Sequence, residues 1–232
     1  MNIANKTILI SGASDGIGRS IALCLARYSV NLVLLGRDQA KLDGVKNICE
    51  TSGSTVKTYA FDLTDKATLD TATQSIKDEG SVDIIVNNAG VWHKSTPLGQ
   101  LEVETIETVI NTNLTAQMLL TRQFIGDMVD RETAIINVIS SAGMQGKAGR
   151  TAYAASKFGM RGFTEALRDE TYGNQIRIGA IFQGGTSTQM FNKAEEAMPL
   201  EKYTNPDDLA EVVLFMLTRP AKIWLNEVQI TY

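Results

Sequence analysis

A tyrosine and a lysine four residues apart are the clearest sign of chemistry in this sequence. Tyr153 and Lys157 stand in the segment Tyr-Ala-Ala-Ser-Lys, and the pair Ser140-Ser141 precedes them. Positions i and i+4 of a helix share one face, so the phenol and the ammonium would point into the same space. A free tyrosine has a pKa of about 10, and a nearby cation lowers it. The pair predicts a tyrosine that exchanges protons near neutral pH, although ordinary helices also contain this spacing.

A glycine-rich segment near the N-terminus predicts a phosphate-binding turn. The apolar run Lys6 to Ile10 is typical of a buried strand, and it leads into Ser11-Gly-Ala-Ser-Asp-Gly-Ile-Gly18 and then a helical pattern over 19–28. Glycine lets the backbone approach a pyrophosphate, and a helix N-terminus favours negative charge. The spacing G-x-x-x-G-x-G differs from the common G-x-G-x-x-G, so the turn by itself could be structural.

Strand and helix patterns alternate along the chain. The expected strands are 7–11, 31–35, 55–60, 82–87, 134–139, 177–182 and 227–230. The expected helices are 17–28, 38–51, 65–79, 103–129, 153–172 and 206–218. This alternation predicts one α/β domain over residues 1–232, a doubly wound, Rossmann-like parallel sheet with helices on both faces.

Composition argues against several classes of function. The 232 residues carry a net charge of −4, whereas nucleic-acid binding usually needs a basic face. No apolar run approaches the roughly 20 residues of a membrane span, and the first residues do not resemble a signal peptide. The single histidine, His93, lacks a neighbouring cluster of acids or thiols, so no metal site is predicted. We expect a cytoplasmic protein without nucleic-acid or membrane partners.

Together, these motifs resemble the short-chain dehydrogenase/reductase family, over a stretch from Lys6 to about Gln229. Further marks of the resemblance are Asp62 in Phe-Asp-Leu-Thr, the run Asn87-Asn-Ala-Gly90, Asn113 in Thr-Asn-Leu, and Thr188 after Gly184. The first motif of the family usually begins with threonine, and Ser11 stands there. The resemblance implies an NAD(P)-dependent oxidoreductase that interconverts a carbonyl and a secondary alcohol.

The resemblance also implies catalytic roles for four residues. Tyr153 would exchange a proton with the substrate oxygen, while Lys157 would lower the tyrosine pKa and bind the nicotinamide ribose. Ser140, thirteen residues before Tyr153, would polarise the carbonyl. Asn113 would hold a water that links Lys157 to solvent. Each also has a structural reading, since serine caps strand ends and asparagine bends helices.

The end of the second expected strand, Leu34-Leu-Gly-Arg37, indicates the cofactor. Family members that use NAD usually carry aspartate where Gly36 stands, and the guanidinium of Arg37 could pair with a 2′-phosphate. We predict NADP(H) in preference to NAD(H). Two acids leave the choice open: Asp38 could read a ribose, and Asp15 stands where many NADP-dependent relatives carry a base.

The resemblance assigns the other cofactor contacts to the glycine-rich turn and to the ends of the third, fourth and sixth strands. With the catalytic pair, the predicted contacts are Gly12, Ser14, Asp15, Gly16, Ile17, Gly18, Arg37, Asp62, Leu63, Asn87, Ala89, Gly90, Tyr153, Lys157, Gly184, Thr186 and Thr188. Asp62 could instead be a turn residue. Gln183-Gly184 replaces the usual proline-glycine pair, which makes the nicotinamide contacts less secure.

The substrate is predicted from the segment 186–205, which we expect to form a lid shorter than in typical family members. A short lid favours a small carbonyl or polyol-like substrate. One alternative is reduction of 3-oxoacyl groups on acyl carrier protein. Reductases of that kind carry bases at places that here read Asp127-Met-Val-Asp-Arg-Glu132 and Tyr172-Gly-Asn174.

Another alternative is a catalytically silent dinucleotide-binding sensor. Such relatives usually lose the tyrosine or the lysine, and this chain retains both. Relatives commonly pair long helices such as those expected over 103–129 and 153–172, so we expect a homodimer or homotetramer. The chain end departs from the family pattern, which puts the tetramer in doubt.

Overall fold

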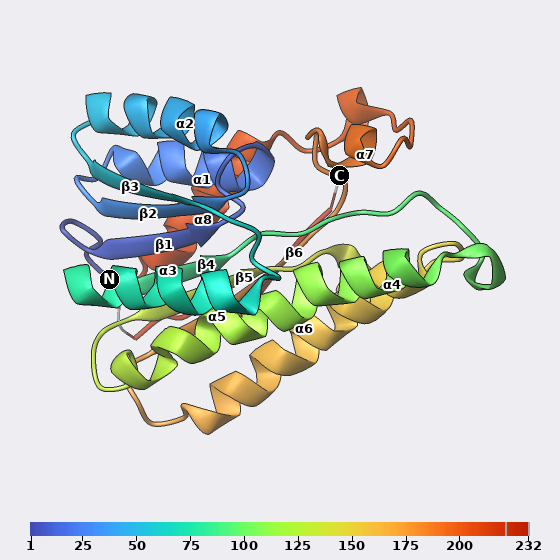
Figure 1. Cartoon of the computed structure of the whole chain (residues 1–232). Coiled ribbons are helices and arrows are strands. Elements are labelled where there is room, and N and C mark those ends of the chain that lie inside the picture. The colour runs from blue at the N-terminus through green and yellow to red at the C-terminus, as the bar shows by residue number, and fades with distance from the viewer. Residues whose placement is uncertain (221, 232) are drawn as a thin grey trace.

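The fold is a computed structural model, which describes residues 1–220 and 222–231 (Figure 1). Its centre is a seven-stranded sheet with the order β3-β2-β1-β4-β5-β6-β7, in which all neighbours are parallel. The strands are β1 Thr7–Ser11, β2 Asn31–Gly36, β3 Thr55–Ala60, β4 Ile84–Asn87, β5 Ala134–Val138, β6 Arg177–Gln183 and β7 Glu227–Ile230. The predicted doubly wound sheet is confirmed. The last residue of the predicted domain, Tyr232, lies outside the described residues.

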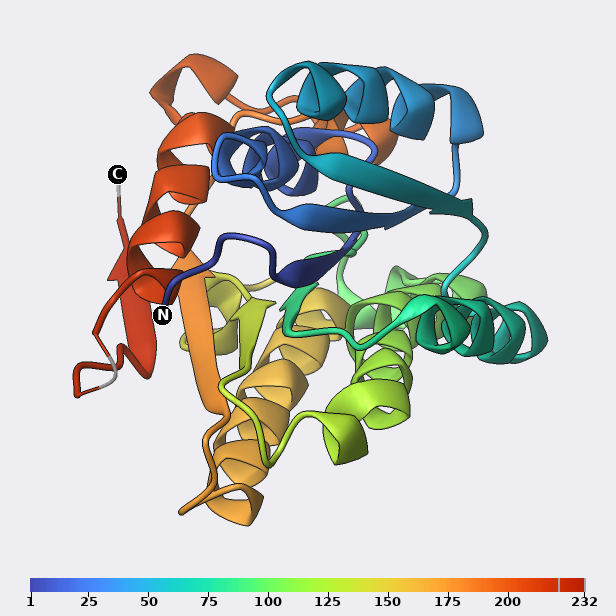
Figure 2. The ribbon, with the colours of Figure 1, turned by 90° about the vertical axis from the view of Figure 1, so that its left-hand side faces the viewer.

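Helices cover both faces of the sheet (Figures 1 and 2). One layer contains α1 Gly16–Ala26, α2 Gln39–Thr51 and α8 Pro206–Leu217, and the other contains α3 Lys66–Glu79, α5 Ala116–Phe124 and α6 Thr151–Glu170. Because side chains alternate along a strand, Ile8 and Ile10 enter the core under the first layer and Leu9 that under the second. In the described residues, no helix has both the length and the apolar character needed to cross a bilayer.

The helix predicted over 103–129 is interrupted. Helix α4 Val103–Ile110 is separated from α5 by a π turn, Asn111–Thr115. At its centre, the buried side chain of Asn113 reaches to Val91, whose N–H donates to Oδ1 at 2.7 Å and whose carbonyl accepts from Nδ2 at 3.0 Å. Such turns commonly mark functional sites. The interruption therefore ties this layer of helices to the loop after β4.

The segment between β6 and α8 projects beyond the carboxyl end of β6 (Figure 1). It contains the short helix α7 Met190–Lys193 and a 3-10 turn, Leu200–Lys202. A short lid helix near Met190 and Phe191 was one of two readings of the sequence, the other being a substrate-pocket lining. The two ends of this segment meet, because Ser187 N–H donates to Thr204 O at 3.0 Å and Thr204 N–H donates to Gly185 O at 3.1 Å. We call residues 186–205 the lid segment.

Candidate active site

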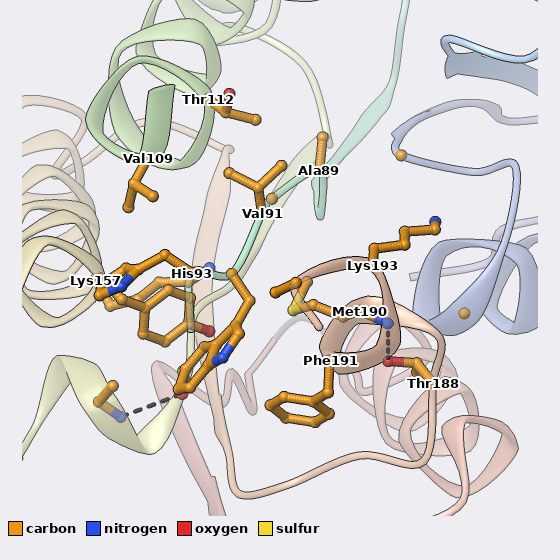
Figure 3. A pocket seen from close by; sticks show the side chains of 18 of the residues that line it. Ala89, Val91, His93, Val109, Thr112, Lys157, Thr188, Met190, Phe191 and Lys193 are labelled. Carbon is orange, nitrogen blue, oxygen red and sulfur yellow. Dashed lines mark hydrogen bonds between the residues drawn. The ribbon is translucent and has the colours of Figure 1, made fainter. Parts of the chain in front are cut away.

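A cavity of about 950 Å³ opens at the carboxyl ends of β1, β2, β4, β5 and β6 (Figure 3). The strand order reverses there between β1 and β4, which is where open α/β sheets bind ligands. The predicted site residues that line it are Gly12, Ser14, Asp15, Gly16, Ile17, Arg37, Asp62, Leu63, Ala89, Gly90, Ser140, Tyr153, Lys157, Gly184, Thr186 and Thr188. Gly18, Asn87 and Asn113 do not line the cavity. Their packing and hydrogen bonds hold the residues that do.

The glycine-rich turn leaves the start of α1 open toward this cavity. Asp15 precedes the helix, but its side chain caps no backbone N–H. The first amides of the helix are therefore available to an anion, which the helix dipole favours. Gly18 lets α1 pack closely against the turn, because a Cβ at this position would lie 2.3 Å from the carbonyl oxygen of Gly12. The turn thus suits an anionic group such as a pyrophosphate, and we call it the cradle.

The two asparagines at the end of β4 differ from the prediction, which made Asn87 a cofactor contact. The amide of Asn87 is buried and donates to Thr121 Oγ1 at 2.9 Å and Asn137 Oδ1 at 2.8 Å, so its side chain joins β4 to its neighbours. Asn88, which was not predicted, lines the cavity and donates to the carbonyls of Ser11 and Gly12 at 3.0 and 3.2 Å. Successive side chains of a strand point to opposite sides, so two consecutive asparagines cannot both point into the sheet. The Asn-Asn pair was therefore the sequence signal that Asn88 could reach the cavity.

The catalytic set predicted from the sequence meets beside this cradle. Tyr153 and Lys157 lie on α6, and Ser140, which follows β5, lines the same cavity wall as the tyrosine. Lys157 Nζ lies 5.7 Å from the centroid of the tyrosine ring and donates to Val138 O at 3.4 Å. The lysine therefore lies beside the tyrosine ring and is held by the end of β5. This geometry brings a proton donor and a second hydroxyl to one point of the cavity wall.

The tyrosine pKa is shifted opposite to the prediction. Burial raises the pKa of Tyr153 to about 12, although the hydrogen bond with Ser140 and the charge of Arg150 oppose the rise. Burial also lowers the pKa of Lys157 to about 8, which weakens the cation that was expected to stabilise the phenolate. The predicted lowering is therefore wrong for this structure. The tyrosine is protonated at neutral pH and ready to donate.

The buried ammonium of Lys157 should cost stability in a pH-dependent way. Between pH 8 and 10.5 the unfolded chain binds a proton that the folded lysine does not, so wild-type stability rises across this window. We expect Lys157→Met to be more stable than the wild type at pH 7, by up to about 3 kcal/mol. Denaturant melts should show this advantage shrinking above pH 8 and gone near 10.5. The exposed Lys66→Met is the control, and a pH-independent gain would contradict the account.

Asn113 lies behind the catalytic set and is fully engaged by protein. Besides its two bonds to Val91, its Nδ2 donates to Ser156 Oγ at 3.2 Å. A Cβ added at Gly90 would lie 3.2 Å from its Oδ1 and 3.7 Å from Lys157 Nζ, so the glycine lets these groups converge. A water relay through Asn113 would have to use its main chain.

The two acids that left the choice between NADP(H) and NAD(H) open both bind groups of the protein itself. Asp38 caps α2 by accepting from Lys41 N at 3.1 Å. Asp15 accepts from Lys193 Nζ of the lid segment at 2.6 Å. Arg37 lines the cavity, and no ion pair or hydrogen bond of its side chain is formed within residues 1–220 and 222–231. At Gly36 a Cβ would lie 3.2 Å from Ser14 Cβ, so an aspartate there would crowd the turn.

The remaining predicted contacts lie at the two ends of the cavity. Asp62 lines it beside Leu63, while its Oδ1 accepts from Thr64 N–H at 2.9 Å and Thr64 Oγ1 at 2.7 Å as a turn residue would. Beyond β6, Thr186 Oγ1 and Gln183 Oε1 are buried and lack a hydrogen-bond partner in the described residues. A ring bearing a carboxamide could satisfy them, and the uncapped turn suits a pyrophosphate. The residues therefore fit a nicotinamide dinucleotide.

The lid segment is tied to the cavity rim at two places. One is the ion pair between Lys193 and Asp15. At the other, Trp92 Nε1 donates to Glu196 Oε2 at 2.5 Å, and Phe191 packs edge-on against the Trp92 ring at 5.3 Å between centroids. Figure 3 shows Phe191, Met190 and Lys193 among the lining side chains. The sequence predicted the place of this segment but not these contacts.

Comparison with known proteins agrees with this geometry. Residues 6–199 match the family model described as short chain dehydrogenase. The 3-oxoacyl-[acyl-carrier-protein] reductase FabG of Thermotoga maritima is 30% identical over 226 residues, which cover 93% of this chain and 92% of that protein. A metagenomic short-chain oxidoreductase in complex with NADP has a TM-score of 0.87 at 28% identity, covering 100% of both chains. Serine dehydrogenase complexed with NADP+, in its closed form, has a TM-score of 0.86 at 28% identity, covering 96% of this chain and 93% of that one.

Proposed function

The chain belongs to the short-chain dehydrogenases, and from this premise we propose that it reduces a small carbonyl compound with NADP(H), with Tyr153 as the proton donor. As a member of this family it is an NAD(P)-dependent oxidoreductase. One observation carries the finer proposal: Tyr153 and Ser140 line the same cavity as the open start of α1. The test is NADPH oxidation over a panel of small aldehydes and ketones.

Ser140, Tyr153 and Lys157 have different roles in the proposed mechanism. The bound cofactor supplies a hydride to the carbonyl carbon. Ser140 holds the carbonyl oxygen beside Tyr153, whose hydroxyl proton passes to that oxygen as negative charge develops on it. Lys157 would orient the cofactor ribose and replenish the proton. The protonated form of the tyrosine dominates at pH 7 and is the form that reduction requires, while the raised pKa makes it a weaker acid than a free phenol.

Arg37 should decide between the two nicotinamide cofactors. Its guanidinium has no ion pair in the described residues, and Asp38 is engaged in capping α2. We expect Arg37→Ala to weaken NADPH binding by about 10- to 100-fold, because a charge-assisted pair with the 2′-phosphate is lost. NADH binding should change little. Fluorescence titration of both cofactors measures the ratio, and a wild type that binds NADH as tightly as NADPH would contradict the assignment.

A second candidate is reduction of 3-oxoacyl groups on a carrier protein. It is favoured by the 30% identity to FabG of Thermotoga maritima. Against it stands the lack of added bases at 127–132, where Asp127 pairs with Lys77 and Glu132 pairs with Arg177, so this stretch offers little positive charge to an acidic carrier. Assay of a carrier-bound 3-oxoacyl thioester against the same group on a short free thiol decides between the candidates, because carrier recognition should improve only the first.

The assembly we propose is a homodimer formed through α5 and α6. Met118 on α5 and Phe158 on α6 leave 41% and 44% of their surface exposed. Phe158→Glu should therefore convert a dimer to monomers, because it buries an unpaired charge at the interface. Light scattering coupled to size exclusion measures the mass. Phe215→Glu, on α8 of the other face, is the control, and a monomeric wild type would contradict the proposal.

A further inference from the structure

The wall of the cavity beside Tyr153 carries an arginine that pairs with no acid within the described part of the chain. Arg150 immediately precedes α6, three residues before the tyrosine, and lines the cavity. Its guanidinium carbon lies 4.8 Å from the centroid of the Trp92 ring, and that ring lies 4.5 Å from the ring of Tyr153. The cation and the proposed proton donor therefore contact the same indole.

The neighbouring acids do not neutralise this cation. Glu196 accepts from the Trp92 indole, and neither it nor Glu102 or Glu104, which line the cavity, forms an ion pair with Arg150. Within the described residues, the Arg150 side chain also makes no hydrogen bond. A guanidinium so placed has all its donors available to a ligand.

Stacking fixes the orientation of the group. A guanidinium over an indole is held by cation–π attraction, which leaves its edge of N–H donors facing outward. Trp92 is itself held by the lid segment, through Glu196 and through Phe191, whose ring is 5.7 Å from that of Tyr203. The fork is preorganised, and a planar carboxylate matches it with two parallel hydrogen bonds.

We propose that Arg150 binds a carboxylate of the substrate, so that the substrate is a small 2-oxo or 3-oxo acid, or the corresponding hydroxy acid. This inference rests on the proposed function, since the carbonyl must meet Tyr153 while the carboxylate meets Arg150. Because both residues contact the Trp92 ring, we infer an acid whose carbonyl lies close to its carboxylate. Trp92 and Phe191 then form the apolar wall against the rest of the molecule.

The test compares each oxo acid with its methyl ester, in which only the charge is removed. The wild type should prefer the acid, and Arg150→Gln should lower the acid-to-ester ratio of kcat/KM by about 10- to 100-fold. Arg150→Lys should restore part of the ratio, because it keeps the charge but loses the fork. Lys147→Gln removes a cation from the same cavity lining and should lower the ratio far less.

A binding readout separates this inference from the proposed function. With NADP+ present, an oxo acid cannot be reduced and only binds. It should raise the melting temperature of the wild type but not that of Arg150→Gln. A wild type that turns over ester and acid equally, or an Arg150→Gln variant that retains the acid-dependent shift, overturns the inference while hydride transfer stands. If no carbonyl is reduced, the proposed function fails, and the melting shift still decides whether Arg150 binds carboxylates.

Discussion

Tyr153→Phe should abolish turnover while leaving the protein folded and able to bind its cofactor. The substitution removes only the hydroxyl, so the ring keeps its edge contact with Trp92. Without the hydroxyl no side chain can pass a proton to the substrate oxygen, since Ser140 is a far weaker acid. General acid catalysis is worth about 10²- to 10⁴-fold, and kcat should fall by that amount. Steady-state NADPH oxidation gives kcat, and fluorescence titration gives cofactor affinity.

The matched control is Tyr172→Phe, which removes the hydroxyl of a tyrosine that is 91% exposed, past the end of α6. It should behave as the wild type in both measurements. A Tyr153→Phe variant that keeps more than about a tenth of wild-type kcat would remove the tyrosine from the chemistry. Loss of cofactor binding together with turnover would instead indicate a structural role for the phenol.

Gly18→Ala should destroy the cofactor cradle. A Cβ there would lie 2.3 Å from Gly12 O and 2.5 Å from Asn88 Nδ2, so either α1 or the turn must move. The start of α1 would then withdraw from the pyrophosphate, and hydrogen bonds that hold the turn would stretch. We expect cofactor affinity to fall by more than about 100-fold and the free energy of unfolding to fall by about 1–3 kcal/mol. Calorimetric titration and denaturant melts measure the two effects.

Gly44→Ala provides the comparison for Gly18→Ala. Gly44 lies inside α2 with no atom within 4 Å of an added Cβ, so alanine fits without a clash. Helix propensity should make this variant more stable by up to about 1 kcal/mol, with cofactor binding unchanged. If Gly18→Ala bound NADPH as tightly as Gly44→Ala, the cradle would not be where the pyrophosphate sits.

The sheet and most of its helices could be predicted because each depends on local patterns. Apolar runs such as Lys6 to Ile10 and caps such as Asp38 act within a few residues of the element that they define. Periodicity did not predict the break in the long helix, although the structural reading of Asn113 as a helix-bending residue indicated it. The break depends on the bond between Asn113 and Val91, which are 22 residues apart and meet only in the folded protein.

The sequence predicted which residues lie together at the cavity, but it did not predict their electrostatics. The motif spacing identified Ser140, Tyr153 and Lys157, which all line one cavity. It could not give the depth of burial, which raises the tyrosine pKa instead of lowering it. The pairing of Asp15 with Lys193 was equally hidden, because the two residues are 178 positions apart.

The most direct test of the central claim is to follow a label from the cofactor into the product. NADPH deuterated at C4 of the nicotinamide, on either face, is incubated with the protein and the panel of small carbonyl compounds, oxo acids included. The proposed function predicts an alcohol with one deuterium on the former carbonyl carbon from one of the two labelled cofactors, formed in step with NADP+, and none from Tyr153→Phe. A protein that binds NADPH tightly yet transfers deuterium to no carbonyl would contradict it and favour the silent sensor.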